Sequence, residues 1–187
     1  EGVDILINNA GVSYRSVIEH MTDEDEAIQI ATNYLGPMAL IRAVLPNMRD
    51  KGRGKIINIS SVSGMLAMPT MSSYSASKAA LEGASEALWY EMRPFGIDVS
   101  LIQPGFIHSD SFKNVRYTEK AKQSENGDDP YTEFYKNMRP FISKLMGISR
   151  MPAEKVAQLV LHVVQTQHPP LWVPASIDAE FFYYLRR

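Results

Sequence analysis

The sequence predicts an α/β fold, in which a doubly wound parallel sheet carries helices on both of its faces. Strand signals and helix signals alternate along the chain, and this order is typical of parallel sheets. The composition is that of a globular domain, with 45% hydrophobic residues, 21% charged residues and a net charge of −2. We therefore expect one domain over residues 1–187, with no internal repeat and no domain linker.

The first strand and the first long helix are predicted from local patterns. A buried strand is expected at Asp4–Asn8, where apolar residues follow one another. The next helix should begin after Thr22, a candidate N-cap, and end near Arg49. Its first turn, Asp23 to Glu26, is acidic, which the helix dipole explains without any functional role. Proline cannot donate an amide hydrogen bond, so Gly36-Pro37 should bend this helix.

Three later strands and three later helices complete the predicted alternation. The strands are expected at Lys55–Ser60, Asp98–Gln103 and Trp172–Pro174. The helices are expected from Ser72 or Ser73 to about Phe95, from Pro152 or Ala153 to near Gln167, and over the tail Asp178–Arg187. Gly96 is suited to end the helix before it, because glycine readily adopts the left-handed conformation of a C-cap.

The segment 106–150 interrupts the alternation. It is long for a connection between a strand and a helix, which favours a lid over a substrate site. The segment is rich in aromatic and methionine side chains, which suit an apolar, bulky substrate: Phe106, Phe112, Tyr117, Tyr131, Phe134, Tyr135, Met138, Phe141 and Met146. The alternative is that many of these side chains pack the lid onto the body of the domain.

Ser61, Tyr74 and Lys78 are the candidate catalytic residues. Tyr74 and Lys78 are one helical turn apart, so their side chains project from the same face of the predicted helix. Free tyrosine has a pKa of about 10, and a nearby ammonium favours its phenolate. Ser61 follows a strand signal and could hold a substrate oxygen. Together the three residues could move a proton on and off an alcohol oxygen, whereas the Tyr-Lys pair alone would also fit a solvated helix surface.

Further motifs precede and follow these three residues in the sequence. Asn8-Asn9-Ala10-Gly11 follows the first strand, Asn33 lies in the long helix, and Ile102-Gln103-Pro104-Gly105 closes a later strand. With Ser61, Tyr74 and Lys78, their order and spacing resemble the classical short-chain dehydrogenase/reductase family, most densely from Val3 to Ser109. The resemblance implies a Rossmann-like fold. The long lid and the aromatic tail are similar to those of the retinol and steroid dehydrogenase branch.

The resemblance also implies a role for each matching residue. Tyr74 would be the general acid and base, Lys78 would lower its pKa, and Ser61 would bind the substrate oxygen. Asn33 would kink its helix and hold a water that connects Lys78 to solvent. The cofactor would be NAD or NADP, contacted by Tyr74 and Lys78 and by Asn9, Ala10, Gly11, Pro104, Gly105, Ile107 and Ser109.

The glycine-rich turn of that family has no counterpart in the sequence. A pyrophosphate cradle requires glycines for close backbone approach and a helix N-terminus for charge. In the resembling family this turn lies well before the position of Asn8, as does the residue that separates NAD from NADP. We therefore expect the sequence to represent the later part of such a domain, with the earlier strands and helices missing from it.

Composition excludes several other classes of function. The sequence has no cysteine, which excludes disulfides and thiol catalysis and is compatible with a cytoplasmic location. Its four histidines lack the close spacing of a metal site, so no metal is expected. The balanced charge argues against nucleic acid, and no apolar stretch is long enough for a membrane span.

The sequence thus predicts an NAD(P)-dependent oxidoreductase that interconverts an alcohol and a carbonyl on an apolar, bulky small molecule. Two alternatives stay open. The chain could be a non-catalytic fragment or an oligomerising module, because the strand Asp4–Asn8 would expose an unpaired edge. It could also resemble a 3-oxoacyl-carrier-protein reductase, whose acidic carrier would need a basic patch, which Lys113, Arg116, Lys120 and Lys122 supply in part. In the resembling family the helices that bear Asn33 and Tyr74 pack against a second subunit, so a homodimer or homotetramer is expected.

Overall fold

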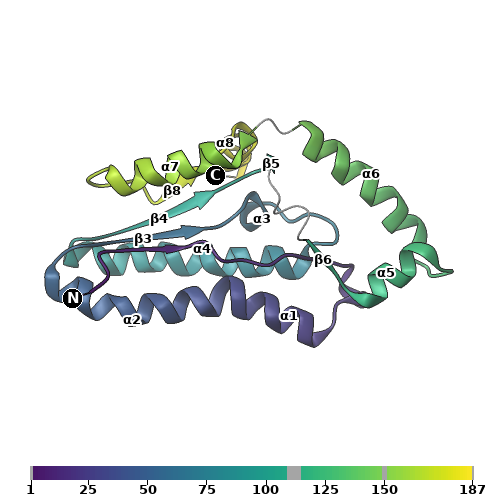
Figure 1. Cartoon of the computed structure of the whole chain (residues 1–187), viewed down its shortest axis with the longest axis horizontal. Helices are drawn as coiled ribbons and strands as arrows, with labels where there is room; N and C mark the ends of the chain where they lie inside the picture. The colour runs from purple at the N-terminus through teal and green to yellow at the C-terminus, as the bar shows by residue number, and fades with distance from the viewer. Residues whose placement is uncertain (1, 109–114, 149–150, 187) are drawn as a thin grey trace.

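The computed structural model describes residues 2–108, 115–148 and 151–186. Its central element is a four-stranded parallel sheet in the order β1-β3-β4-β8. These strands span Ile5–Asn8 (β1), Gly54–Ile59 (β3), Ile97–Gln103 (β4) and Trp172–Pro174 (β8). The parallel sheet and the flanking helices confirm the predicted α/β fold class (Figure 1).

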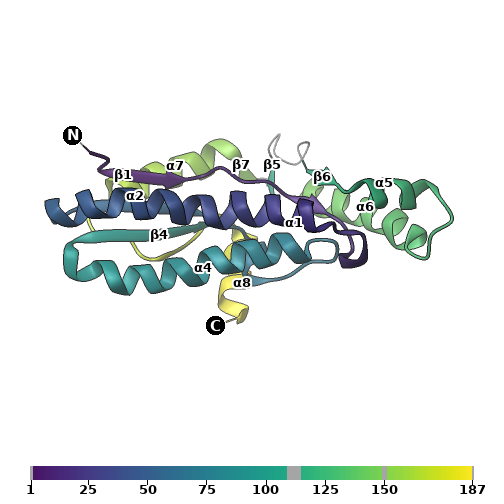
Figure 2. The same ribbon diagram turned by 90° about the horizontal axis from the view of Figure 1, so that it is seen from below.

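Helices cover both faces of the sheet, and each face has its own core. On one face, α2 (Gly36–Lys51) and α4 (Ser72–Met92) pack with strand residues such as Ile56 and Val99. On the other, α7 (Ala153–Gln165) packs with Ile57 and Ile102 (Figures 1 and 2). Neighbouring residues of β3 therefore face opposite cores, and both are fully buried because the sheet is covered on both sides.

The predicted long helix is interrupted at Asn33, where the resemblance implied a kink, and not at Gly36-Pro37. It begins as α1 (Asp23–Ile30), where Thr22 caps the amide of Asp25, and it continues as α2 to Lys51. A π-helical turn, η2 (Ala31–Leu35), lies between them and contains Asn33. The irregularity thus precedes Gly36-Pro37 rather than falling on it. The physical reason is that Pro37 has no amide hydrogen to give to the carbonyl of Asn33, four residues earlier.

The other predicted elements lie within a few residues of their expected bounds. The helix expected to reach Phe95 ends as α4 at Met92 and continues as a 3₁₀ turn, η3 (Arg93–Phe95), to the left-handed cap Gly96. The helix expected to reach Gln167 ends at Gln165, and the terminal helix α8 spans Ile177–Arg186. A short helix that was not predicted, α3 (Val62–Met65), directly follows β3.

The segment expected to form a lid contains two helices, α5 (Glu119–Asn126) and α6 (Thr132–Ile148), which contact each other beyond the carboxyl end of the sheet (Figure 1). Short strand pairs join the segment to the body: β2 (Tyr14–Arg15) with β6 (Arg116–Tyr117), and β5 (Ile107–His108) with β7 (Met151–Pro152). In η1 (Ile18–His20), the buried His20 lies 3.1 Å from the hydroxyl of Tyr135 on α6.

Candidate active site

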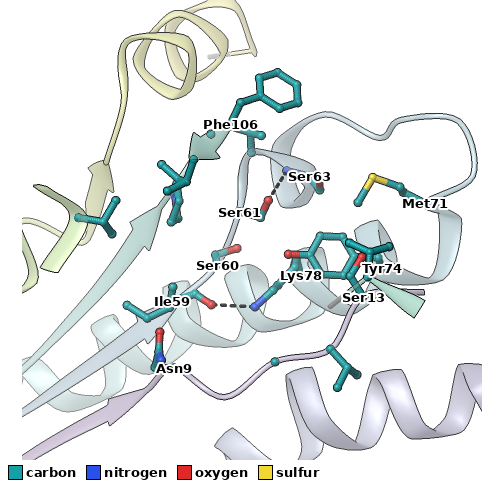
Figure 3. Close-up of a pocket in the computed structure, with 18 of the residues that line it drawn as sticks. Asn9, Ser13, Ile59, Ser60, Ser61, Ser63, Met71, Tyr74, Lys78 and Phe106 are labelled. Carbon is teal, nitrogen blue, oxygen red and sulfur yellow. Dashed lines mark hydrogen bonds between the residues drawn. The ribbon is translucent and has the colours of Figure 1, made fainter. Parts of the chain in front are cut away.

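A cleft of about 820 Å³ opens at the carboxyl ends of the strands. This is the edge of a parallel sheet where ligands usually bind. Three of the predicted catalytic residues line it, namely Ser61, Tyr74 and Lys78 (Figure 3). The predicted cofactor contacts Asn9, Gly11, Pro104, Gly105 and Ile107 line it as well. Residues from distant parts of the sequence therefore meet around one space, because three strands end there.

Helix α4 presents Tyr74 and Lys78 to the cleft from consecutive turns. Lys78 is 5% exposed, and its Nζ donates a hydrogen bond of 2.8 Å to the carbonyl oxygen of Ile59 at the end of β3. The same ammonium lies 5.9 Å from the centre of the Tyr74 ring. Lys78 is thus anchored to the sheet and held beside the tyrosine.

Burial has opposite effects on the pKa values of these two groups. It lowers the pKa of Lys78 to about 8, and the nearby Glu82 carboxylate acts in the opposite direction. Burial also raises the pKa of Tyr74, although the Ser61 hydroxyl and the charge of Arg15 favour the phenolate. The expectation of a lowered pKa for Tyr74 is therefore not met by the protein groups alone, because the loss of hydration outweighs the favourable neighbours.

Ser61 lies where β3 gives way to α3. It is the N-cap of α3, and its Oγ accepts a hydrogen bond of 3.1 Å from the amide of Ser63. Its neighbour Ser60 points to the interior and donates a hydrogen bond of 2.7 Å to Glu82. Both serines line the cleft, and Ser60 in addition ties the strand end to α4.

Asn33 is buried directly behind the cleft rather than in its lining. Its Nδ2 donates to the carbonyl of Val12 at 2.8 Å and to Ser77 Oγ at 3.0 Å, and its Oδ1 accepts from the amide of Val12 at 2.9 Å. A Cβ on Gly11 would lie 3.3 Å from Asn33 Oδ1 and 3.8 Å from Lys78 Nζ. Asn33 therefore joins the turn after β1 to α4, and Gly11 leaves room for the Asn33 side chain.

The turn after β1 does not place all of its residues in the cleft. Asn8 is buried and donates a hydrogen bond of 2.7 Å to Asn58 on β3. Asn9 and Gly11 line the cleft, whereas Ala10 does not. The side chains of Asn8 and Asn9 point to opposite sides of the strand, since they alternate along it. The first asparagine is therefore structural, and the second faces the space that a ligand could occupy.

The loop after β4 is fixed by the start of α8. Ser176 Oγ accepts a hydrogen bond of 3.1 Å from the amide of Gly105, and Asp178 Oδ2 accepts one of 2.9 Å from the amide of Phe106. A Cβ on Gly105 would overlap Asp178 Oδ2 and Ser176 Oγ, so a larger residue would displace the two side chains that hold the loop. Pro104, Gly105 and Ile107 are thereby held at the cleft, while Ser109, the remaining predicted contact, lies outside the described residues.

Glu82 is a buried carboxylate that was not predicted from the sequence. It stands one turn after Lys78 on α4 and accepts hydrogen bonds from Ser60 at 2.7 Å and from Gln103 at 2.9 Å. These two partners are at the ends of β3 and β4. Glu82 therefore connects both strand ends to the helix that carries Tyr74, and its position on the Tyr74 face of α4 was a signal available in the sequence.

The lining of the cleft differs from the expected set of lid aromatics. Of the aromatic and methionine residues expected to contact a substrate, only Phe106 lines the cleft within the described part of the chain. Tyr135 instead packs the lid, because its hydroxyl accepts a hydrogen bond of 3.0 Å from the amide of Val17. The apolar lining comes largely from elements outside the lid, including Met68 and Met71 before α4 and Val156 and Val160 of α7.

Arg15 is a charged residue in the cleft lining that was not predicted from the sequence. It lies on β2, directly after the turn that contains Gly11, and is only 7% exposed. A charged residue so close to the Asn-Asn-Ala-Gly motif was the available signal. Within the described ranges, no group of three acidic or histidine side chains could hold a metal ion, and no helix is both long and apolar enough to cross a bilayer.

Comparison with known proteins identifies the family of the chain. The family model for short chain dehydrogenase matches residues 1–120. The chain is 45% identical over 185 residues to dehydrogenase/reductase SDR family member 7B of Xenopus laevis, and the match covers 98% of the chain and 51% of that relative. The chain spans about half the length of the curated relatives that it matches.

Solved structures show the same relationship. A short-chain dehydrogenase from Streptomyces avermitilis superposes with a TM-score of 0.81 at 32% identity, covering 98% of this chain and 64% of the other. A gluconate 5-dehydrogenase from Burkholderia cenocepacia, in complex with NADP and tartrate, matches with a TM-score of 0.57 at 32% identity, covering 59% and 43%. The resemblance seen in the sequence is confirmed, and the chain belongs to the short-chain dehydrogenase/reductase family.

Proposed function

We propose that the protein is an NAD(P)-dependent oxidoreductase that interconverts an alcohol and a carbonyl, with Tyr74 as its general acid and base. The observation that carries the proposal is the convergence of Ser61, Tyr74 and Lys78 on one cleft at the carboxyl end of a parallel sheet. A hydroxyl, a phenol and an ammonium in one partly enclosed space suit proton transfer to a single oxygen.

In the oxidation direction, the phenolate of Tyr74 takes the proton of the substrate hydroxyl as the carbon loses its hydride. In reduction, the neutral phenol returns that proton to the forming alkoxide. Ser61 holds the substrate oxygen, and the Lys78 ammonium, 5.9 Å from the centre of the Tyr74 ring, stabilises the phenolate. Asn33 fixes the turn after β1 and the backbone of α4, through which Lys78 keeps its place.

The cleft suits a nicotinamide dinucleotide, which supplies the hydride chemistry when it is bound. The NADP complex of the gluconate 5-dehydrogenase supports this cofactor class. Gly11 and Gly105 leave backbone exposed to the cleft, as close approach to a flat ring requires. Asn9, Pro104, Ile107 and Lys78 are the residues that would hold the cofactor. A positive charge on the oxidised nicotinamide would also favour the Tyr74 phenolate, which burial alone disfavours.

The substrate is proposed to be largely apolar. Met68, Met71, Phe106 and Val115 line the cleft near the catalytic residues, and methionines adapt readily to chains of different shape. Lid helices α5 and α6 lie beyond this lining and would limit access of water. Two further expectations stay predictions: a cytoplasmic location, and a homodimer or homotetramer, for which α2 and α4 expose Leu40 and Tyr90.

Tyr74→Phe tests the proposal, because it removes one hydroxyl and keeps the ring. Turnover of ketones with NADH or NADPH should fall by about 10³-fold or more, with unchanged circular dichroism and thermal midpoint. Tyr90→Phe is the matched control, since Tyr90 lies on the same helix and is 63% exposed. Turnover by Tyr74→Phe within a factor of a few of the unmodified protein would overturn the assignment.

A further inference from the structure

The wall of the cleft is positively charged. Among the described residues that line it are Arg15, Lys78 and Arg116, and none of these lining residues is an aspartate or glutamate. Lys78 directs its ammonium to the carbonyl of Ile59 and belongs to the proposed catalytic group. The two arginines have no part in the proton transfer proposed above. They are held by the β2–β6 strand pair, at the border between the body and the lid.

Arg15 combines deep burial with access to the cleft. It is 7% exposed, and its strand position places it opposite Tyr117 of β6. Arg15 and Tyr74 line the same cleft, and the charge of Arg15 favours the Tyr74 phenolate by lowering its pKa, in opposition to burial.

Arg116 stands at the more exposed side of the same strand pair. Its Nη1 donates a hydrogen bond of 3.1 Å to the hydroxyl of Tyr14, and its guanidinium lies 5.6 Å from the centre of that ring. Tyr14 is itself buried, so Arg116 is held over a fixed surface. A ligand that enters the cleft past β6 would meet Arg116 before it reaches Arg15.

We propose that Arg15, supported by Arg116, forms an anion subsite, so that the substrate carries a carboxylate or phosphate group near its reacting oxygen. This inference rests on the function proposed above and narrows its substrate class. A guanidinium offers several donors in one plane, which match the oxygens of carboxylates and phosphates. Met68, Met71 and Phe106 would contact the remaining apolar part, so the substrate would be an amphiphile with an anionic end.

The alternative role for Arg15 is purely electrostatic. Its charge favours the Tyr74 phenolate, and removing it would slow proton transfer for every substrate alike. An anion subsite predicts a different result, since only substrates with an anionic group would lose affinity. A pair of substrates that differ in this group alone therefore separates the two roles.

The first experiment compares reduction of 4-oxodecanoate with reduction of its methyl ester by the unmodified protein and by Arg15→Met. The anion subsite predicts that kcat/KM for the acid falls by roughly ten- to hundred-fold, mainly through KM, while that for the ester changes less than about threefold. Arg15→Lys should recover part of the loss, and Arg116→Met should show a smaller loss for the acid. Arg49→Met, a remote and exposed arginine on α2, is the matched control.

An equal loss for acid and ester would overturn the inference in favour of an electrostatic or structural role. Unchanged kinetics for both substrates would also overturn it. A shift of the pH profile that is the same for both substrates would accompany the electrostatic role and not the anion subsite.

A binding experiment keeps the inference separate from the proposed catalysis. Calorimetric titrations with decanoate, decyl phosphate and methyl decanoate need no turnover. Tighter binding of either anion than of the ester, weakened about tenfold by Arg15→Met, would support the subsite even if no ketone were reduced, and the tighter anion would identify the charged group. Equal binding of anions and ester, or affinities that Arg15→Met leaves unchanged, would overturn it.

Discussion

The amide of Asn33 donates a hydrogen bond of 3.0 Å to the hydroxyl of Ser77, one residue before Lys78. This bond joins the π-helical turn η2 to helix α4. Ser77 in turn donates a hydrogen bond of 2.7 Å to the carbonyl oxygen of Tyr74. Asn33 also pairs with both backbone groups of Val12. One buried amide therefore fixes the turn after β1 relative to the helix that carries the proposed acid and base.

Asn33→Ala should destabilise the protein and slow catalysis together. The change leaves the amide and carbonyl of Val12 and the hydroxyl of Ser77 without this partner, which should lower the free energy of unfolding by about 2–4 kcal/mol. Urea unfolding and kcat measured on the same preparations check this. Leu35→Ala is the control, because Leu35 lies on the same turn but is 51% exposed. A loss no larger than that of the control would contradict the structural role of Asn33.

The order of the strands and helices could be predicted because each signal is local. The apolar run before Asn8, the Thr22 cap and the glycine at position 96 all depend on neighbouring residues, and the structure places a strand, a helix start and a C-cap there. The predicted burial of the first strand was wrong, because β1 is an edge strand of the described sheet and its Ile5 and Ile7 are 40% and 43% exposed. The π-helical turn agrees with the kink that the family resemblance implied at Asn33, whereas the local signal alone assigned the bend to the proline rather than to the carbonyl that the proline leaves unpaired. Local chemistry thus predicts elements better than their irregularities.

The spacing of residues in the sequence predicted the trio Ser61, Tyr74 and Lys78 at the cleft, but it did not predict the residues that surround them. Tyr74 and Lys78 share a helix face, but the partners of Glu82 and the place of Arg15 depend on contacts between distant segments. The direction in which the pKa of Tyr74 shifts also depends on how far folding removes water from its hydroxyl, and no sequence motif reveals this. For the same reason, sequence could not separate lid aromatics that face the cleft from those, such as Tyr135, that pack the lid.

Glu82→Gln should shift the pH dependence of activity without unfolding the protein. The amide is nearly the same size and keeps an oxygen that can accept from Ser60 or Gln103, but it removes the negative charge that raises the pKa of Lys78. Lys78 should then lose its proton at lower pH, so the alkaline limb of the kcat/KM profile should move to lower pH. The pH profile from pH 6 to pH 10 measures this shift.

The control for that experiment is Glu91→Gln, which removes a charge from an exposed position on the same helix. Its profile should match that of the unmodified protein. A Glu82→Gln profile that keeps its shape and position, with only a lower rate, would mean that Glu82 acts solely by holding the strand ends.

Gly105→Ala should weaken both folding and cofactor binding. The new Cβ would overlap Asp178 Oδ2 and Ser176 Oγ, so either these side chains or the loop after β4 must move, which weakens the hydrogen bonds that hold the loop to the start of α8. We expect a loss of about 1–3 kcal/mol in unfolding free energy and a higher Kd for NADH or NADPH. Urea unfolding and fluorescence titration measure the two effects.

Gly83→Ala is a control that should change the stability of the protein in the opposite direction. Gly83 lies in α4, where an added Cβ meets nothing within 4 Å, so the change should stabilise the helix by about 0.5–1 kcal/mol. Combining Gly105→Ala with Asp178→Ala removes one of the two clashes and should recover part of the loss. Full stability of Gly105→Ala alone would contradict the tight contact between this loop and α8.

Stability should rise with pH between about pH 8 and the onset of tyrosine ionisation, because of Lys78. The pKa of Lys78 is about 8 in the folded protein, whereas the ordinary value of 10.5 applies to the unfolded chain. In this pH range the unfolded chain therefore binds more protons than the folded one. The free energy of unfolding should therefore increase by about 2 kcal/mol from pH 7 to pH 9.5. Above pH 10 the raised pKa of Tyr74 acts in the opposite direction, since the unfolded chain then loses its tyrosine proton first.

Lys78→Met should remove this rise and make the protein more stable near pH 7, because it no longer buries a charge there. Lys136→Met, a change at an exposed lysine on α6, should leave the rise in place. Urea unfolding at pH 7 and pH 9.5 for the three proteins decides the matter. If the unmodified protein lost stability over this pH range, and Lys78→Met showed the same pH dependence, the pKa of Lys78 in the folded protein would be its ordinary value. The high-pH limb of catalysis would then have to be assigned to another group.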